Sequence, residues 1–213
     1  MWEANGDWDA ALKWFAARRG KVTASRIADL SARTKSGWGA SRGNYMSELI
    51  VERLTDTTAD SYTNAAMQWG IETEPLAVEA YEFQTANLVD YNSKRFTIHP
   101  RIAMSGASPD GLVDGGLIEV KCPQTKTHID TLLSGKVAGN YQKQIQWQLA
   151  CEDRDWCDFI SFDPRMPADM RLWIKRIERD DNLILELEEQ VEEFLEELEG
   201  KILALTEWSK NNE

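Results

Sequence analysis

The sequence contains few of the features that mark membrane, secreted or zinc-binding proteins. No run approaches the ~18 consecutive apolar residues that a membrane span needs, and the N-terminus lacks the basic start and apolar centre of a leader peptide. There are three cysteines, none in a CxxC pair, and only two histidines, which lie far apart. We therefore expect a cytoplasmic protein with reduced thiols, and no zinc ribbon, disulfide framework or histidine-based metal site.

The sequence also lacks the excess of Lys and Arg that nucleic-acid-binding proteins usually carry. Its net charge is −12, from 24 basic and 36 acidic residues. The charge is unevenly distributed, because residues 178–213 hold 13 acidic and 3 basic residues, which leaves a net charge of only −2 for residues 1–177. A nucleic-acid partner for this nearly neutral part is therefore not excluded.

Apolar residues recur with helical spacing over several stretches. The longest stretch continues through Gly70 and Pro75, whereas the glycine-rich residues 37–43 are expected to form a flexible loop. The segments predicted to be helical are 8–30, with a short connection at 20–23, then 45–54, 65–86, 140–151 and 183–205.

Extended segments fill the middle of the chain, which together with the helices indicates an α+β fold. Residues 107–121 predict a strand, a turn at Gly115-Gly116 and a second strand. The other predicted strands are 96–99 and 102–105, separated by a His-Pro-Arg turn, then 156–162 and 170–177.

The predicted hairpin carries a group of charged residues. We expect Asp110 on its first strand, with eight residues between it and Glu119 on the second. Side chains alternate between the faces of a strand, so Glu119 and Lys121 share one face while Val120 points into the core. Pairing across the turn would bring Asp110 beside Glu119. Two carboxylates and the carbonyl oxygen of Val120 make a site of hard oxygen ligands that suits Mg²⁺.

The lysine fits the same chemistry. Hydrolysis of a phosphodiester requires an activated water and neutralisation of charge in the transition state, and metal ions supply most of both. Lys121 would orient or deprotonate the attacking water and offset charge. Glu74, on the preceding helix, is a candidate for a further carboxylate on the metal, and Gln144, on the following helix, for positioning water or a phosphate oxygen.

Pro109-Asp110, eight residues and Glu119-Val120-Lys121 resemble the PD-(D/E)XK nuclease signature. The flanking motifs narrow the resemblance to the lambda exonuclease-like (YqaJ-like) phage recombination exonucleases, over residues 14–181. The motifs that recur in similar order and spacing are Trp69-Gly70 with Glu74, Ser108-Pro109-Asp110-Gly111-Leu112, Glu119-Val120-Lys121-Cys122-Pro123, Gln144-Ile145-Gln146, Asp163-Pro164-Arg165-Met166 and Ile177-Glu178-Arg179-Asp180.

This resemblance implies both a fold and a site. The fold is a PD-(D/E)XK core, in which helices flank a central mixed β-sheet. The carboxylates and carbonyl named above would hold one or two Mg²⁺ ions, for which Mn²⁺ would substitute. The implied catalytic residues are Asp110, Glu119, Lys121, Glu74 and Gln144, and the implied metal ligands are Asp110, Glu119, Val120 and Glu74.

The family also holds the 5′-terminal phosphate of DNA in a basic pocket lined by hydroxyl groups. The matching positions here are Arg18, Ser25 and Ser108. Arginine suits such a pocket because its planar fork binds two phosphate oxygens at once.

The implied activity is digestion of one strand of linear double-stranded DNA from 5′ to 3′, which releases mononucleotides and leaves 3′ single-stranded tails for recombination. Family members act as ring-shaped trimers, and a closed ring would explain processive digestion. The implied partners are 5′-phosphorylated DNA ends, a phage single-strand annealing protein and two further copies of the chain. No membrane is involved, and a phage-encoded protein would act in the cytoplasm of its bacterial host.

A chain of 213 residues can bury one good core, so we expect a single nuclease domain spanning 1–213. It would consist of an N-terminal helical part at 1–64, a catalytic core at 65–181 and an acidic amphipathic helix at 182–213. The apolar residues of this last helix recur at steps of four and three, which predicts that it packs on its own domain. A subunit contact and a DNA-mimicking acidic surface are the alternatives.

Two other functions remain open at this point. One is a related endonuclease on the same fold, and the other is a catalytically silent subunit that binds DNA ends. An iron-sulfur nuclease is disfavoured because three scattered cysteines cannot supply four cluster ligands.

Overall fold

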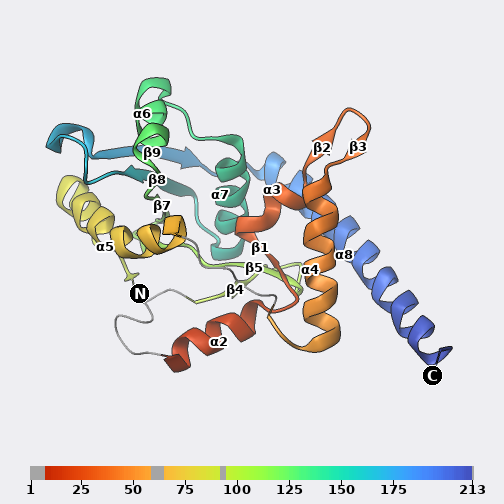
Figure 1. Ribbon diagram of the computed structural model, residues 1–213. Coiled ribbons are helices and arrows are strands. Elements are labelled where there is room, and N and C mark those ends of the chain that lie inside the picture. The colour runs from red at the N-terminus through yellow and green to blue at the C-terminus, as the bar shows by residue number, and fades with distance from the viewer. Residues whose placement is uncertain (1–7, 59–64, 92–94, 213) are drawn as a thin grey trace.

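The computed structural model describes residues 8–58, 65–91 and 95–212, in which helices flank a central sheet and a smaller one, while a two-stranded hairpin projects from the body (Figure 1). The α-helices are α2 (Trp8–Arg18), α3 (Ile27–Leu30), α4 (Ala40–Thr55), α5 (Ala65–Thr85), α6 (Thr125–Ser134), α7 (Gly139–Glu152) and α8 (Asp181–Lys210), and the 3-10 turns are η1 (Ala24–Arg26) and η3 (Ala168–Met170). The strands are β1 (Val22–Thr23), β2 (Arg33–Thr34), β3 (Gly37–Trp38), β4 (Thr97–Ile98), β5 (Ser105–Ala107), β6 (Gly111–Val113), β7 (Gly116–Lys121), β8 (Trp156–Phe162) and β9 (Leu172–Glu178).

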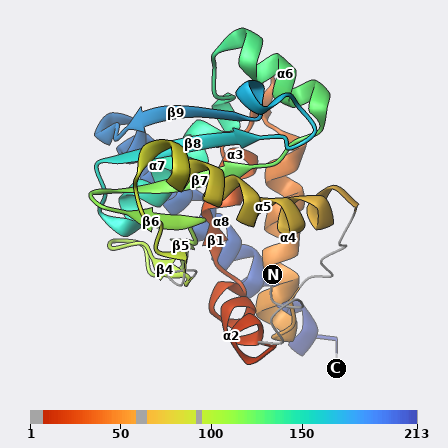
Figure 2. The same cartoon turned by 90° about the vertical axis from the view of Figure 1, so that its left-hand side faces the viewer.

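The central sheet has four strands in the order β6-β7-β8-β9. Strands β7 and β8 run parallel and the other two pairs run antiparallel, so the sheet is mixed. Ile118 and Val120 of β7 pack towards α5, whereas Leu117 packs towards α7 on the opposite face. Figure 2 shows α5 lying across the sheet. The predicted fold, an α+β core with a mixed sheet between helices, is confirmed.

A second sheet joins the N-terminal segment to the centre of the chain. Its order is β1-β5-β4, and β1 runs parallel to β5 with Val22 opposite Ser105 and Thr23 opposite Gly106. The sequence predicted only a connection at 20–23, so strand β1 was missed. The predicted strand 102–105 is also wrong except for Ser105, because residues 102–104 form the turn that precedes β5.

The hairpin β6-β7 turns at Asp114 and Gly115, where Gly115 has a φ of +74° that favours glycine. Gly116, predicted in the turn, already pairs in β7 opposite Val113. A Cβ atom at Gly116 would lie 2.4 Å from the ring of Trp156, which explains the second glycine. Asp110 was predicted on the first strand, but it occupies a bend immediately before β6.

The predicted flexible loop at 37–43 is wrong. Residues 33–38 form the hairpin β2-β3, and α4 begins at Ala40. The ring of Trp38 lies between two guanidinium groups, 3.6 Å from Arg33 and 4.3 Å from Arg42 as measured to its centroid. These tertiary contacts order a segment whose glycine content alone indicates a loop.

The acidic helix α8 packs on its own chain, as predicted. Its apolar seam, which includes Leu187, Phe194 and Leu198, is fully buried in a core shared with Ile27 of α3 and Tyr45 of α4. Beyond this core, the C-terminal end of α8 extends away from the sheets (Figure 1). No helix in the described part of the chain has the length and apolar character to cross a membrane.

Candidate active site

Asp110 is fixed against the edge of β7. One of its carboxylate oxygens accepts a hydrogen bond of 2.7 Å from the backbone N–H of Val120. The N–H and C=O of one strand residue point to the same edge, so the carbonyl oxygen of Val120 also lies on the edge that Asp110 occupies. The bend at Asp110 therefore places its carboxylate against the backbone of Val120, the residue that follows Glu119.

Glu119 lies on the opposite face of β7 from α5, and its side chain is almost completely buried. Two glutamines of α7 hold the two oxygens of its carboxylate. Gln144 donates to Oε1 at 2.7 Å and Gln148 donates to Oε2 at 2.7 Å. These two residues are one helical turn apart, so they reach one carboxylate from the same side of α7.

Lys121 also donates a hydrogen bond to Oε1 of Glu119. Burial alone would lower the pKa of the ammonium group, but the carboxylates of Glu119 and Asp110 outweigh burial and raise it. Lys121 is therefore a cation at neutral pH when these two carboxylates carry no other counter-ion. The predicted group of Asp110, Glu119, Lys121 and Gln144 is thus brought together around the end of β7.

Glu74 lies on α5, on the other face of β7 from Glu119. It accepts a hydrogen bond of 2.9 Å from the hydroxyl of Tyr91. Burial, Glu74 and Asp110 together raise the pKa of the Cys122 thiol to about 12, and the same three causes raise that of the Tyr91 phenol. Glu74 and Asp110 therefore act on the same small region, which contains Tyr91 and Cys122.

An open cleft joins the two sides of β7 at its C-terminal end. It has a volume of about 400 Å³. The residues that line it are Ala66, Met67, Gly70 and Glu74 of α5, Val120, Lys121, Cys122 and Pro123 at the end of β7, and Tyr141 of α7. A substrate in this cleft would meet Lys121 and Glu74 directly.

The donor chemistry at this place fits a magnesium ion. Asp110, Glu74 and the carbonyl of Val120 supply hard oxygen ligands beside a solvent-accessible cleft, which leaves room for the water molecules that Mg²⁺ retains. In the described part of the chain, no three His, Cys, Asp or Glu side chains are gathered closely enough to form a metal site by themselves. A site here would therefore depend on the backbone carbonyl and on water.

Two of the three predicted phosphate-binding residues, Ser25 and Ser108, follow strands β1 and β5, and the third, Arg18, is the last residue of α2. Thr23 is opposite Gly106 in this parallel pair. Ser25 and Ser108, each two residues further along, therefore lie at the same end of the two strands. Trp14 connects the third residue, because its indole N–H donates to the hydroxyl of Ser108 at 3.0 Å and its ring lies 4.1 Å from the guanidinium carbon of Arg18. Ser108 is only two residues from Asp110.

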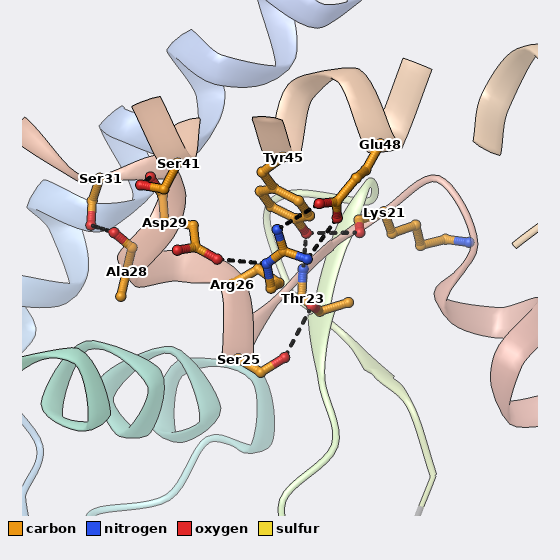
Figure 3. Close-up of polar contacts among 10 residues, drawn as sticks. All are labelled: Lys21, Thr23, Ser25, Arg26, Ala28, Asp29, Ser31, Ser41, Tyr45 and Glu48. Carbon is orange, nitrogen blue, oxygen red and sulfur yellow. Dashed lines mark hydrogen bonds and ion pairs between the residues drawn. The ribbon is translucent and has the colours of Figure 1, made fainter. Parts of the chain in front are cut away.

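Arg18 has no ion-pair partner within the described ranges of the chain, which makes it the free cation of this group. Burial lowers its pKa, against the opposing effects of Tyr45 and Glu52. Arg26, by contrast, is held between Asp29 at 2.6 Å and Glu48 at 2.7 Å, close to Ser25 (Figure 3). A desolvated guanidinium without a counter-ion gains more from binding an anion than one that is already paired.

Sequence reasoning missed two residues of this site. Gln148 is fully buried and bonds Glu119, and its position four residues after Gln144 on a predicted helix is a signal that was available. Trp14 links Arg18 to Ser108, and no local pattern predicts this contact over 94 residues of sequence.

The fold and the site together define the class of protein as a nuclease. The alkaline exonuclease LHK-Exo from Laribacter hongkongensis has a crystal structure that is 52% identical to the chain, with a TM-score of 0.87, and the match covers 95% of this chain and all of that one. A second crystal structure of LHK-Exo, in complex with dAMP, matches at 52% identity with a TM-score of 0.88 and the same coverage. The chain belongs to the YqaJ-like viral recombinase domain family, whose model matches residues 13–155.

A more distant likeness supports the fold alone. A phage-related exonuclease from Haemophilus somnus 129PT is 17% identical, with a TM-score of 0.69 over 87% of this chain and 96% of that one. No curated protein matches the chain significantly. The predicted membership of the lambda exonuclease-like, YqaJ-like family is confirmed, and the chain is accordingly an exonuclease of the phage recombination type.

Proposed function

We propose that the chain is a Mg²⁺-dependent exonuclease that digests one strand of linear double-stranded DNA from 5′ to 3′ and releases mononucleotides. The observation that carries this proposal is the grouping of Asp110, Glu119 and Lys121 around the end of β7, beside an open cleft. The 3′ single-stranded tails that remain would serve recombination by strand annealing.

The residues at the cleft divide the work of hydrolysis. One or two Mg²⁺ ions, or Mn²⁺ in their place, would polarise the scissile phosphate and lower the pKa of the attacking water when bound. Asp110, Glu119, Glu74 and the carbonyl of Val120 would hold them. Lys121 orients the attacking water and offsets the negative charge of the transition state, and its raised pKa favours these roles over proton abstraction. Gln144 keeps the carboxylate of Glu119 in place and is positioned to contact water or a phosphate oxygen.

Recognition of the 5′ end rests on Arg18, Ser25 and Ser108. The hydroxyl groups would donate hydrogen bonds to the terminal phosphate, while the guanidinium of Arg18, which has no ion-pair partner among the described residues, offsets its charge. Ser108 is two residues from Asp110, so a phosphate held there places a nearby phosphodiester at the cleft. The structure of LHK-Exo in complex with dAMP, a mononucleotide, supports release of single nucleotides.

We further propose that the chain assembles as a ring-shaped homotrimer on DNA and works with a phage single-strand annealing protein in the bacterial cytoplasm. A closed ring would keep the enzyme on its substrate between successive cuts. Light scattering of the purified protein tests the assembly, and a monomer at micromolar concentration with and without duplex would exclude the ring.

Product analysis tests the proposed activity. Linear duplex with 5′-phosphates is incubated with Mg²⁺, with one strand labelled at its 5′ end or its 3′ end, beside a closed circular control and a reaction containing EDTA. We expect labelled mononucleotide at once from the 5′ label and late from the 3′ label, with no cutting of the circle and none in EDTA. Oligonucleotide products from the circle would instead indicate an endonuclease, and DNA-end binding without hydrolysis would indicate a silent subunit.

A further inference from the structure

Two motifs of the sequence each contain a residue with no role in the candidate active site, and these two residues meet in the fold. One contains Trp69, near the start of α5, and the other is Asp163-Pro164-Arg165-Met166, which follows β8. The guanidinium carbon of Arg165 lies 4.5 Å from the centroid of the Trp69 ring. Within the described ranges, the indole N–H of Trp69 finds no hydrogen-bond acceptor, so the contact is made by the face of the ring.

Arg165 is itself held in place by hydrogen bonds to Asp163 and Pro123. Its Nε and Nη2 donate to the two carboxylate oxygens of Asp163 at 2.7 and 3.0 Å, and its backbone N–H bonds Asp163 at 3.0 Å. Nη2 also donates to the carbonyl of Pro123 at 3.2 Å, two residues after Lys121. Asp163 is fully buried. Arg165 therefore joins the end of β8, the end of β7 and the start of α5.

Among the described residues, the start of α5 buries less of its side-chain surface than the rest of the helix. None of the side chains of residues 65–72 is buried, whereas the second half of the helix buries Ala77, Val78 and Tyr81. Pro75 removes one backbone hydrogen bond between these halves of the continuous helix, because it has no N–H to bond the carbonyl four residues earlier. Three residues of this weakly held half, with Glu74 just after it, line one wall of the cleft.

We propose that Arg165 is a positioning residue that holds the first two turns of α5 and so fixes the width of the cleft and the place of Glu74. The inference rests on the proposed function only in that the cleft receives the DNA strand. The planar fork of arginine satisfies Asp163 and stacks on Trp69 at the same time, which a lysine at this position does not do.

The chain offers a closely matched control in Arg176. This residue also donates to both oxygens of a buried aspartate, Asp158, at 2.9 and 3.0 Å, and lies 3.5 Å from the ring of Trp156. The side chains of Arg165 and Arg176 are 44% and 46% exposed. Asp158 accepts a bond from Tyr81, so the control unit supports the second half of α5, away from the cleft.

Amide hydrogen exchange tests the positioning without any reference to activity. We expect Arg165→Ala and Trp69→Ala to accelerate exchange of the amides at 69–74 by about tenfold or more while the second half of α5 is unchanged, because local opening is set by local contacts. Trp69→Phe, which retains an aromatic face, should preserve most of the protection. Unchanged exchange at 69–74 in both alanine variants would overturn the inference.

Kinetics on linear duplex complete the test. Arg165→Ala and Arg165→Lys should each lower kcat/KM by about ten- to a hundredfold, as expected when a binding wall moves by about an ångström. Arg176→Ala should leave kcat/KM within about threefold of the wild type. Equal losses in the Arg165 and Arg176 variants would refute a specific role for Arg165. An inactive wild type would instead contradict the proposed function, and the exchange result would still decide the positioning.

Discussion

The side-chain amide of Gln148 donates a hydrogen bond of 2.7 Å to the buried carboxylate of Glu119, on the oxygen that Gln144 and Lys121 leave free. A carboxylate taken out of water is costly unless its oxygens are hydrogen-bonded, so this amide stabilises the charged form of Glu119 in the core. Gln148 therefore supports the site without reaching the cleft.

Replacing this donor should weaken both the fold and the site. We expect Gln148→Met, which retains the volume but removes the N–H, to lower the free energy of unfolding by about 1–3 kcal/mol, the usual cost of leaving a buried acceptor unpaired. Denaturant titration measures the loss. Gln142→Met, on the exposed side of the same helix, serves as the control, and equal stability of the two variants would contradict the assignment.

Lys121→Ala should separate binding from chemistry. We expect folding and DNA binding to be nearly unchanged, because Glu119 retains both glutamine donors, while hydrolysis slows by about 10² to 10³, the range for removing one group that stabilises charge in the transition state. Single-turnover rates on linear duplex measure this. Lys126→Ala, on exposed helix α6, should cleave at the wild-type rate, and a Lys121 variant with wild-type turnover would remove the residue from the mechanism.

Arg18→Ala should abolish most of the preference for a 5′-phosphorylated end. The reason is that Arg18 is the cation of this group without a carboxylate partner in the described residues. Competition between phosphorylated and unphosphorylated duplex measures the preference. The control variant is Arg19→Ala, because Arg19 is the neighbouring arginine and already pairs with Asp56.

Trp14→Phe should reduce the preference for a 5′-phosphate less than Arg18→Ala does, because it loses the hydrogen bond to Ser108 but retains an aromatic ring against Arg18. A uniform loss on both kinds of end would disprove the pocket.

His99 should make stability depend on pH between about 4 and 6.5. The residue is buried, its ring stacks 4.5 Å from that of Trp147, and burial followed by the charges of Arg101 and Arg179 lowers its pKa from 6.5 to about 4. Glu188 faces the ring at 3.3 Å, but Arg101 shares its charge at 3.0 Å.

The sign of this pH dependence of stability follows from proton binding. Between these two pKa values the unfolded chain binds the proton and the folded chain does not, so stability rises with pH across this window and falls on acidification by up to about 3 kcal/mol. We expect His99→Gln to lose less stability than the wild type between pH 7 and pH 5, as measured by denaturant titration. Parallel pH profiles for the two proteins would contradict this.

The catalytic hairpin was predictable because its information is local. Alternation along a strand placed Glu119 and Lys121 on one face, whereas the turn lies one residue earlier than predicted and Asp110 precedes the first strand. Asp110 lies in a bend before β6, and its carboxylate is held by the N–H of Val120, which is a tertiary contact rather than a sequence pattern. The strand at 156–162 was predicted with its observed bounds.

The contacts between distant segments were not predictable. Strand β1 has two residues, too few to show any periodicity, and its partner lies more than 80 residues further along the chain. The same holds for Trp69 and Arg165, whose motifs were recognised separately but whose contact depends on how α5 crosses the sheet. The single-domain layout at 1–64, 65–181 and 182–213, the metal ions and the trimer remain predictions.

The shared packing of Tyr45 and Phe194, whose rings stack at 5.7 Å, has a consequence for how the protein is made. During translation, the N-terminal helices leave the ribosome long before the helix that completes their core, so they must wait with apolar surface uncovered until the last part of the chain emerges. A stop codon between Tyr141 and the start of α8 would therefore yield a chain that exposes this surface permanently and aggregates, even though every residue that lines the cleft had already been synthesised.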